Sequence, residues 1–220
     1  MEKRSAAREL AFLALFQLPQ KSENVNTDKL SKMDLHAICL SAIRTLADHA
    51  KENIKSAESY FIKAERALME HQIDHEANEG LNQASRSVEV PQTEEFIEHL
   101  DKCYQGISLM RESLQVPELY WHYNDESTKE FTLELILKYI NNKEEVENLI
   151  KEVSQSWKFD RIQKTERKLI ELGAAEMLSS SIPHTVVVSE IIKIANKYST
   201  DEGIKFINGV LADIVKLIKD

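Results

Sequence analysis

Apolar residues recur at alternating steps of four and three between residues 43 and 68, the most regular hydrophobic pattern in the chain. The series consists of Ile43, Ala47, Ala50, Ile54, Ala57, Phe61, Ala64 and Leu68. This spacing is a heptad seam, which lies on one side of a helix and has to be covered by another helix. Because no Gly or Pro occurs between Pro19 and Gly80, the pattern predicts one long helix over roughly residues 29–80.

A second segment with the same spacing follows Pro91 and can cover this seam. Its apolar residues are Ile97, Leu100, Tyr104, Ile107 and Leu114. Thr93 is a suitable N-cap for the segment, and Pro117 is expected to end it. We therefore predict an antiparallel hairpin of residues 29–80 against 93–115, with the apolar residues of the two segments facing each other. A second copy of the chain could cover the seam equally well, so a homodimer is an open alternative.

The other segments have the spacing of amphipathic helices. Helices are predicted over residues 3–18, 126–141, 143–157, 165–179 and 184–198. A last helix begins with Ser199 or Thr200 as N-cap, and Asp201 and Glu202 in its first turn suit the helix dipole. Its buried stripe is predicted to be Ile207, Val210, Leu211, Ile214 and Ile218.

The scarcity of turn-forming residues gives the fold class. The 220 residues include 5 Gly and 4 Pro, about 4% of the chain where ordinary usage gives roughly 12%. A doubly wound α/β domain or a β-sandwich needs more turns than nine such residues can make. With 42% hydrophobic and 30% charged residues, the chain can still bury a core. We predict an all-α protein.

The net charge of −9 is distributed unevenly along the chain. Residues 51–150 carry 10 basic and 21 acidic groups, whereas residues 1–50 carry 7 and 6 and residues 151–220 carry 11 and 10. The overall acidity argues against a general polyanion binder. It does not exclude RNA contact at the two balanced ends, because electrostatic attraction is screened within about 8–10 Å.

No motif points to catalysis. Cys39 and Cys103 are isolated and are expected to be reduced thiols of a cytoplasmic protein. His71 and His75 lie four residues apart, but Gln72 stands where a zinc protease needs Glu, so we interpret both as structural or solvated. We expect no enzyme activity, metal or cofactor, and no apolar run is long enough to span a membrane.

The last helix carries an unusual set of residues around its buried stripe. Phe206 and Asn208 lie about 100° to either side of the core-facing direction, and Lys205 lies nearly opposite it. Gly203 and Gly209 each cost about 1 kcal/mol relative to Ala inside a helix. Either these glycines allow close helix packing, or they let a partner approach beside a stacking ring, an amide and a cation. The second set of groups is used to bind single-stranded RNA.

Residues 206–211 read FINGVL and follow Asp201-Glu202-Gly203 and Lys205; this segment resembles the characteristic C-terminal segment of the NusB family. The similarity extends back through Val187-Val188 and Glu190, and through Glu166-Arg167 with Leu172 and Glu176. At the start of the chain, Ala7-Arg8-Glu9-Leu10 is similar to the Arg-rich first helix of that family.

The resemblance implies an all-α fold of two small helical bundles and a role in bacterial transcription antitermination. It predicts one domain over residues 1–220, with a first helix (1–20), an enlarged central hairpin (28–117) and a C-terminal bundle (120–220). It implies binding to the boxA element of nascent ribosomal RNA together with the ribosomal protein NusE, in the transcription elongation complex. The RNA-binding residues that it implies are Lys3, Arg4, Arg8, Lys205, Phe206 and Asn208, and the NusE-binding residues are Glu166 and Arg167.

These assignments require the first helix to pack close to the last. Arg4 and Arg8, which share a helix face, would then reach an RNA strand that stacks on Phe206. The alternative is a helical adaptor that retains the fold and binds proteins without specific RNA binding. The acidic hairpin favours this alternative, because its charge repels phosphate.

Overall fold

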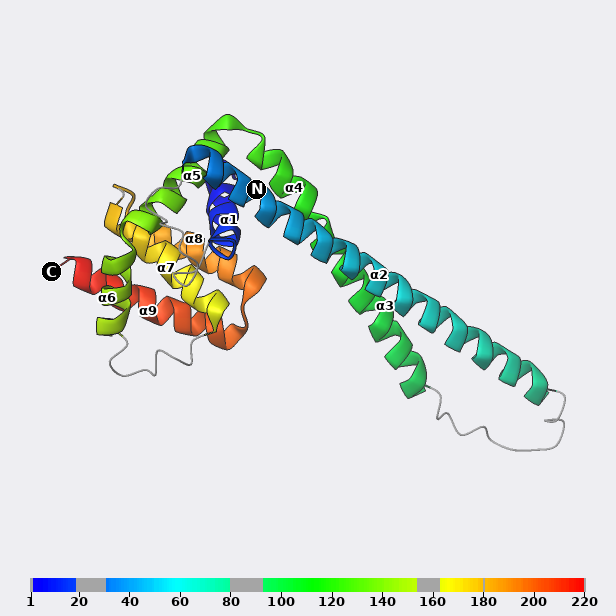
Figure 1. The fold of residues 1–220 in the computed structure, drawn as a ribbon. Helices are drawn as coiled ribbons and strands as arrows, with labels where there is room; N and C mark the ends of the chain where they lie inside the picture. The colour runs from blue at the N-terminus through cyan, green and yellow to red at the C-terminus, as the bar shows by residue number, and fades with distance from the viewer. Residues whose placement is uncertain (1, 19–30, 80–92, 154–162, 180, 220) are drawn as a thin grey trace. The chain divides into compact units, whose positions relative to one another are not determined.

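The computed structural model describes residues 2–18, 31–79, 93–153, 163–179 and 181–219, and the secondary-structure elements in this part of the chain are all α-helices (Figure 1). The all-α prediction is therefore confirmed. The helices are α1 (Lys3–Leu15), α2 (Lys32–Glu79), α3 (Thr93–Ser113), α4 (Gln115–Tyr123), α5 (Glu126–Asn141), α6 (Lys143–Val153), α7 (Lys164–Ser179), α8 (His184–Tyr198) and α9 (Asp201–Lys219). The end predicted for α6, near residue 157, lies outside the described residues.

The chain divides into two compact units. Unit 1 contains residues 1–44 and 119–220, and unit 2 contains residues 45–118. The first part of α2 belongs to unit 1 because Leu35 and Cys39 are buried there. His36 Nδ1 also lies 2.7 Å from the hydroxyl of Tyr123, at the end of α4.

In unit 1, α1 packs mainly on α5 and also contacts α7 and α8. Four of its alanines are fully buried and allow this close approach: Ala6, Ala7, Ala11 and Ala14. Helix α9 packs on α6, α7 and α8, and the buried part of its predicted stripe is Ile207, Val210, Leu211 and Ile214. Gly173 of α7 brings that helix against Leu211, since a Cβ on Gly173 would lie 3.1 Å from a Leu211 methyl carbon.

Polar residues cap two of these helices, and one of them, Thr200, was predicted. Asp125 precedes α5 and accepts a hydrogen bond of 3.0 Å from the backbone N–H of Thr128. Thr200 precedes α9, and its hydroxyl oxygen accepts a hydrogen bond of 3.2 Å from the backbone N–H of Gly203. Each hydroxyl or carboxylate satisfies an N–H that the first turn of the helix leaves unpaired.

Pro117 does not end the hairpin in the way the sequence analysis expected. Helix α3 ends at Ser113, and a new helix, α4, begins at Gln115 with Pro117 in its first turn. Proline is tolerated there because the first N–H groups of a helix have no intrahelical acceptor. The break falls at residue 114, where a continuous helix would place the proline ring against the carbonyl of Ser113.

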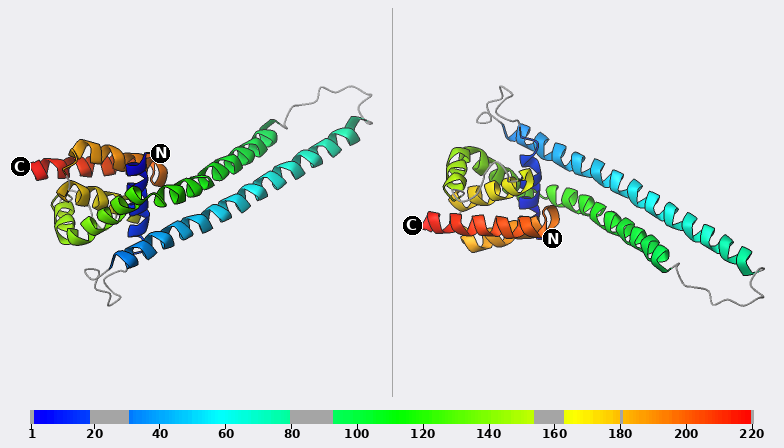
Figure 2. Two further views of the ribbon diagram at one scale, coloured as in Figure 1. Left: turned by 90° about the horizontal axis from the view of Figure 1, so that it is seen from above. Right: turned by 90° about the horizontal axis from the view of Figure 1, so that it is seen from below.

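Unit 2 contains the predicted antiparallel pairing of α2 and α3, which lie side by side in Figure 2. The hydroxyl of Ser113 donates a hydrogen bond of 3.1 Å to the carbonyl of Ala50. Seven residues earlier in α3, a Cβ on Gly106 would lie 3.4 Å from the carbonyl oxygen of Ala57. The contact residue in α2 has a higher number where the contact residue in α3 has a lower one, so the two helices run antiparallel.

The face of α3 that covers α2 is not the predicted one. Small residues form the contact: Ala50, Ala57 and Ala64 of α2 are buried, as are Gly106 and Ser113 of α3. Small residues let two helix backbones approach closely, and the larger apolar side chains of α3 are therefore left outside the contact. The exposed residues are the predicted seam of Ile97, Leu100, Tyr104, Ile107 and Leu114.

Candidate RNA-binding surface

Arg8 lies inside unit 1, although the sequence analysis placed it on an RNA-binding face. Its guanidinium is held by Glu176 of α7, with Nε 2.9 Å from Oε2 and Nη2 2.7 Å from Oε1. Its Nη1 lies 3.6 Å from a carboxylate oxygen of Glu190 in α8. Arg8 is 2% exposed and two carboxylates neutralise it, so a direct phosphate contact by this residue is excluded in this structure.

The surroundings of Glu190 in this cluster favour its ionised form. Burial works against ionisation of Glu190, but hydrogen bonds from Lys193 and Ser5 and the charge of Arg8 hold its pKa below the ordinary value. A buried carboxylate with such partners stays ionised at neutral pH. The Arg8 cluster therefore ties α1 to α7 and α8.

A second buried carboxylate, that of Glu9, joins α1 to the end of α8. It accepts hydrogen bonds from Lys197 Nζ at 2.7 Å and from the hydroxyl of Tyr198 at 2.8 Å. Burial next to this carboxylate raises the pKa of Tyr198. The ring of Phe12 also packs on Tyr198, with centroids 5.2 Å apart.

The first helix was predicted to pack close to the last, and the structure connects the two through α8. Helix α1 packs on α5, α7 and α8, and α8 lies against both α1 and α9. Figure 2 shows α1 at the end of the bundle where α8 leads into α9. The two ends of the chain are therefore brought together through α8, not by direct helix packing.

Lys3 and Arg4 lie on the exposed side of α1. Lys3 Nζ is 2.7 Å from a carboxylate oxygen of Asp125, yet 62% of the Lys3 side chain is exposed. The guanidinium of Arg4 lies 5.5 Å from the ring centroid of Phe131 in α5, a cation–π distance. Both cations can therefore reach a phosphate group from the surface.

The predicted residues of α9 occupy its solvent side. Lys205 and Asn208 are exposed, and Phe206 is half-buried. Ile207, between them, is fully buried, which fixes the rotation of the helix. One face of α9 thus presents a cation and an amide beside the accessible part of an aromatic ring.

The two glycines of α9 have different surroundings. A Cβ on Gly203 would collide with the Ser199 hydroxyl and the Glu166 carboxylate, so this glycine serves internal packing. Around Gly209, no heavy atom of the described residues lies within 4 Å of the Cβ position. Of the four described glycines, Gly209 alone has no packing reason to lack a side chain.

Of the predicted protein-binding pair, Glu166 is buried and Arg167 is partly exposed. Glu166 is 8% exposed, and its carboxylate accepts a hydrogen bond of 3.4 Å from the Ser199 hydroxyl. The Arg167 side chain is 37% exposed, and its Nε donates to Glu171 at 2.7 Å. Arg167 can still be reached from outside, whereas the Glu166 carboxylate is used internally.

The buried acids and two lysines of α8 were not among the functional residues predicted from the sequence. Glu176 falls on the apolar stripe of α7, seven residues after the buried Leu169. A charged residue at a core position requires a buried partner of opposite charge, and that was the available signal. Lys193 and Lys197 add cations to the helix between α1 and α9, but each is paired with an acid, Glu190 or Glu9.

Other chemistry is not indicated within the described ranges. The described residues contain no cluster of three or more His, Cys, Asp or Glu suited to a metal ion. The side chains of His71 and His75 lie outside the described part of the structure. Among the described helices, none has the length and hydropathy needed to cross a bilayer.

Comparison with known proteins connects this geometry to a family. Residues 107–216, half of the chain, match the family model described as the NusB family. The chain is 31% identical to transcription antitermination protein NusB of Trichodesmium erythraeum (strain IMS101) over 209 residues, which cover 94% of this chain and 93% of that protein. The protein of the same name from Gloeothece citriformis (strain PCC 7424) is 28% identical over 216 residues, or 98% and 94% of the two chains. No solved structure is significantly similar to the chain.

Proposed function

The chain belongs to the NusB family, and from this membership we propose that it acts in transcription antitermination as an RNA-binding protein. Relatives at about the same length carry the name transcription antitermination protein NusB. The observation that carries the RNA-binding part of the proposal is the open surface at Gly209, beside Lys205, Phe206 and Asn208.

This glycine is unfavourable for the helix and is not explained by its packing. A glycine inside a helix costs about 1 kcal/mol relative to alanine. At Gly203 the internal contacts account for that cost, but at Gly209 they do not. The bare backbone at Gly209 leaves space for a strand to lie flat on α9, where a base could stack on the exposed part of the Phe206 ring and form hydrogen bonds with Asn208.

The exposed cations of α1 complete the proposed surface. Lys3 and Arg4 would contact phosphates, and their interaction would weaken with salt. Arg8 has a different role in this proposal: through Glu176 and Glu190 it holds α1 in place, so that Arg4 projects from a fixed helix. Lys205 supplies the corresponding charge on α9.

The finer parts of the proposal follow from family membership. The RNA would be the boxA element of nascent ribosomal RNA, bound together with NusE within the transcription elongation complex. Arg167 is the exposed member of the predicted NusE contact, and Glu166 would support it from inside. This role requires no catalysis, and it would place the protein in the cytoplasm, where transcripts are made in bacteria.

The test is an electrophoretic shift with a boxA oligonucleotide, with NusE present or absent. Phe206→Ala should weaken binding by about 1–3 kcal/mol if the ring stacks on a base. Gly209→Ala should stabilise the helix by up to about 1 kcal/mol and yet weaken RNA binding, because the methyl group occupies the space of the strand.

Matched controls separate this surface from general charge. Lys205→Ala is compared with Lys216→Ala, which removes a cation about 16 Å further along the same helix. We expect the first variant to weaken binding and the second to change it little. Unchanged affinity in Phe206→Ala and Gly209→Ala, or no sequence-preferring binding with NusE present, would refute the proposal and favour a protein adaptor without specific RNA binding.

A further inference from the structure

Unit 2 exposes a continuous apolar surface that the pairing of α2 and α3 does not use. Ile97, Leu100 and Ile107 of α3 are 53–56% exposed, and Tyr104 of α3 and Leu114, directly after it, are 71–72% exposed. Their spacing of three and four residues is that of a heptad seam, and such a seam is normally covered by a helix. Isolated exposed apolar residues need no explanation, but a contiguous set at this spacing does.

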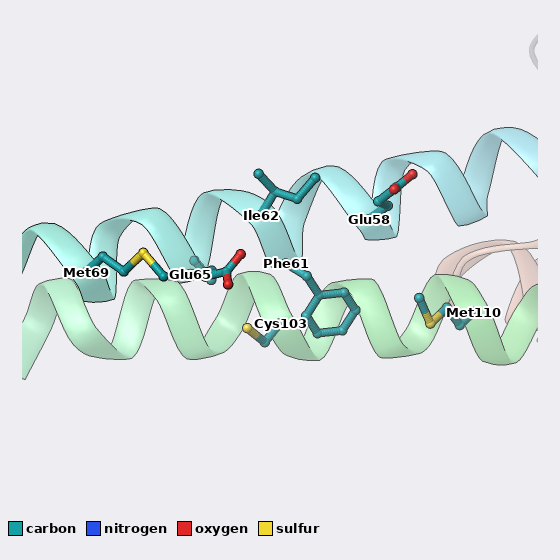
Figure 3. Close-up of a pocket in the computed structure, with 8 residues that line it drawn as sticks. Glu58, Phe61, Ile62, Glu65, Met69, Cys103 and Met110 are labelled. Carbon is teal, nitrogen blue, oxygen red and sulfur yellow. The ribbon is translucent and has the colours of Figure 1, made fainter.

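The surface continues from α3 across a groove to α2. The groove has a volume of about 640 Å³ and is lined by Phe61, Ile62 and Met69 of α2 and by Cys103 and Met110 of α3, among others. Figure 3 shows Phe61 pointing from α2 toward α3, with Cys103 and Met110 along the facing helix. From the helical period of about 100° per residue, Leu100 and Ile107 lie within about 60° of Cys103 on the same side of α3. Leu100 and Ile107 of the α3 seam therefore border the groove.

Acidic side chains accompany this apolar surface. Glu58 and Glu65, seven residues apart on α2, line the groove and are exposed. Neither has an ion-pair partner among the side chains that the structure describes. Asp101 is also exposed, next to Leu100 on α3. Residues 45–118 as a whole carry fifteen acidic and seven basic groups.

We propose that this surface is the docking site for a basic amphipathic helix of a partner protein. An apolar stripe on the partner would cover Leu100, Ile107 and the groove, and flanking lysines or arginines would pair with Glu58 and Glu65. A second copy of the chain fits less well, because it would bring the same glutamates against each other. RNA fits less well too, because its phosphates would meet unpaired carboxylates.

The hairpin segment lies within the region over which this chain is similar to its relatives. The matches to the Trichodesmium and Gloeothece proteins cover 94% and 98% of this chain and so extend through most of residues 45–118. The inference goes beyond RNA binding and uses residues of unit 2 only. Its test can therefore fail or succeed independently of the RNA surface.

The experiment uses the full chain and a labelled synthetic peptide of about three heptads, with Leu at the a and d positions and Lys at the flanking positions. Fluorescence anisotropy at low and high salt measures binding, and a second peptide with Glu in place of Lys is the control. Maleimide labelling gives a second readout, because a bound helix would protect Cys103 in the groove. We expect the Lys peptide to bind, to protect Cys103 and to bind more weakly in high salt.

Variants locate the binding site. The double variant Glu58→Lys and Glu65→Lys should bind the Lys peptide more weakly and the Glu peptide more tightly than the parent chain does. Ile107→Asp should weaken the Lys peptide by about tenfold or more, from lost apolar burial. Glu112→Lys changes the same charge on the opposite side of α3, about 180° from Cys103, and should leave binding nearly unchanged.

Three results would overturn the proposal. The first is equal binding of the two peptides, which would show that charge does not select the occupant. The second is binding that is unaffected by Ile107→Asp and by the double charge reversal. The third is no binding of either peptide. Sedimentation would then identify a second copy as the occupant if the chain self-associates and Ile107→Asp abolishes that association. All variants should retain the circular dichroism spectrum and RNA shift of the parent chain.

Discussion

Replacing Arg8 with alanine should destabilise the protein strongly, and the reason is the charge that it leaves behind. Glu176 is 0% exposed, and Arg8 contacts both of its carboxylate oxygens, at 2.7 and 2.9 Å. Removing one member of a buried ion pair costs about 3–5 kcal/mol, because the other charge remains buried without compensation. Against a typical total stability of about 5–15 kcal/mol, this is a large fraction.

Urea unfolding followed by circular dichroism measures the effect. Arg4→Ala is the matched control: Arg4 lies four residues earlier on α1, is exposed, and makes a cation–π contact with Phe131. We expect a loss of about 1 kcal/mol or less for Arg4→Ala and a marked fall in RNA affinity. For Arg8→Ala we expect the loss of stability to be the larger effect.

A double variant tests the physical reason. Arg8→Met combined with Glu176→Leu removes both charges and should recover most of the stability lost in Arg8→Ala, since apolar residues of similar volume replace buried ion pairs at little cost. The reasoning is refuted if Arg8→Ala unfolds at the urea concentration of the parent chain, or if the double variant is no more stable than Arg8→Ala.

Three further predictions concern other parts of unit 1. Gly203→Ala should destabilise the protein by about 1–3 kcal/mol in thermal unfolding, because its Cβ meets the Glu166 carboxylate; a stabilised variant would contradict the packing described. Burial opposes ionisation of Glu171, but Lys168 and Arg167 hold its pKa below 4.5, so its stabilisation is present above that pH and is lost as the pH falls through the lowered pKa. In Glu171→Gln, the free energy of unfolding should therefore fall less steeply as the pH is lowered below 4.5. An unchanged slope would refute this linkage. Burial raises the pKa of Cys39 to about 11, so native iodoacetamide labelling at pH 8 should be many times slower than for unfolded protein, and equal rates would refute it.

Much of the helical arrangement could be predicted because its determinants are local. The bounds predicted for residues 126–141 and 184–198 are those of α5 and α8, because the signals lie within a few residues of each helix: Asp125 caps α5, Pro183 directly precedes α8, and apolar spacing runs through both. The exposure of Lys205 and Asn208 also followed from the stripe through Ile207, since one buried residue sets the rotation of a helix.

The sequence alone determined that the chain is helical, where most helices begin and end, and that its acidic residues gather in a hairpin. Only the tertiary structure decided which face of α3 meets α2, whether Arg8 is outside or inside, and which of Gly203 and Gly209 has a packing partner. Periodicity specifies an angle around one helix but not the distance to the next. That distance depends on small residues such as Gly106 and Ala57, and the environment of Arg8 depends on Glu176, 168 residues away in the chain.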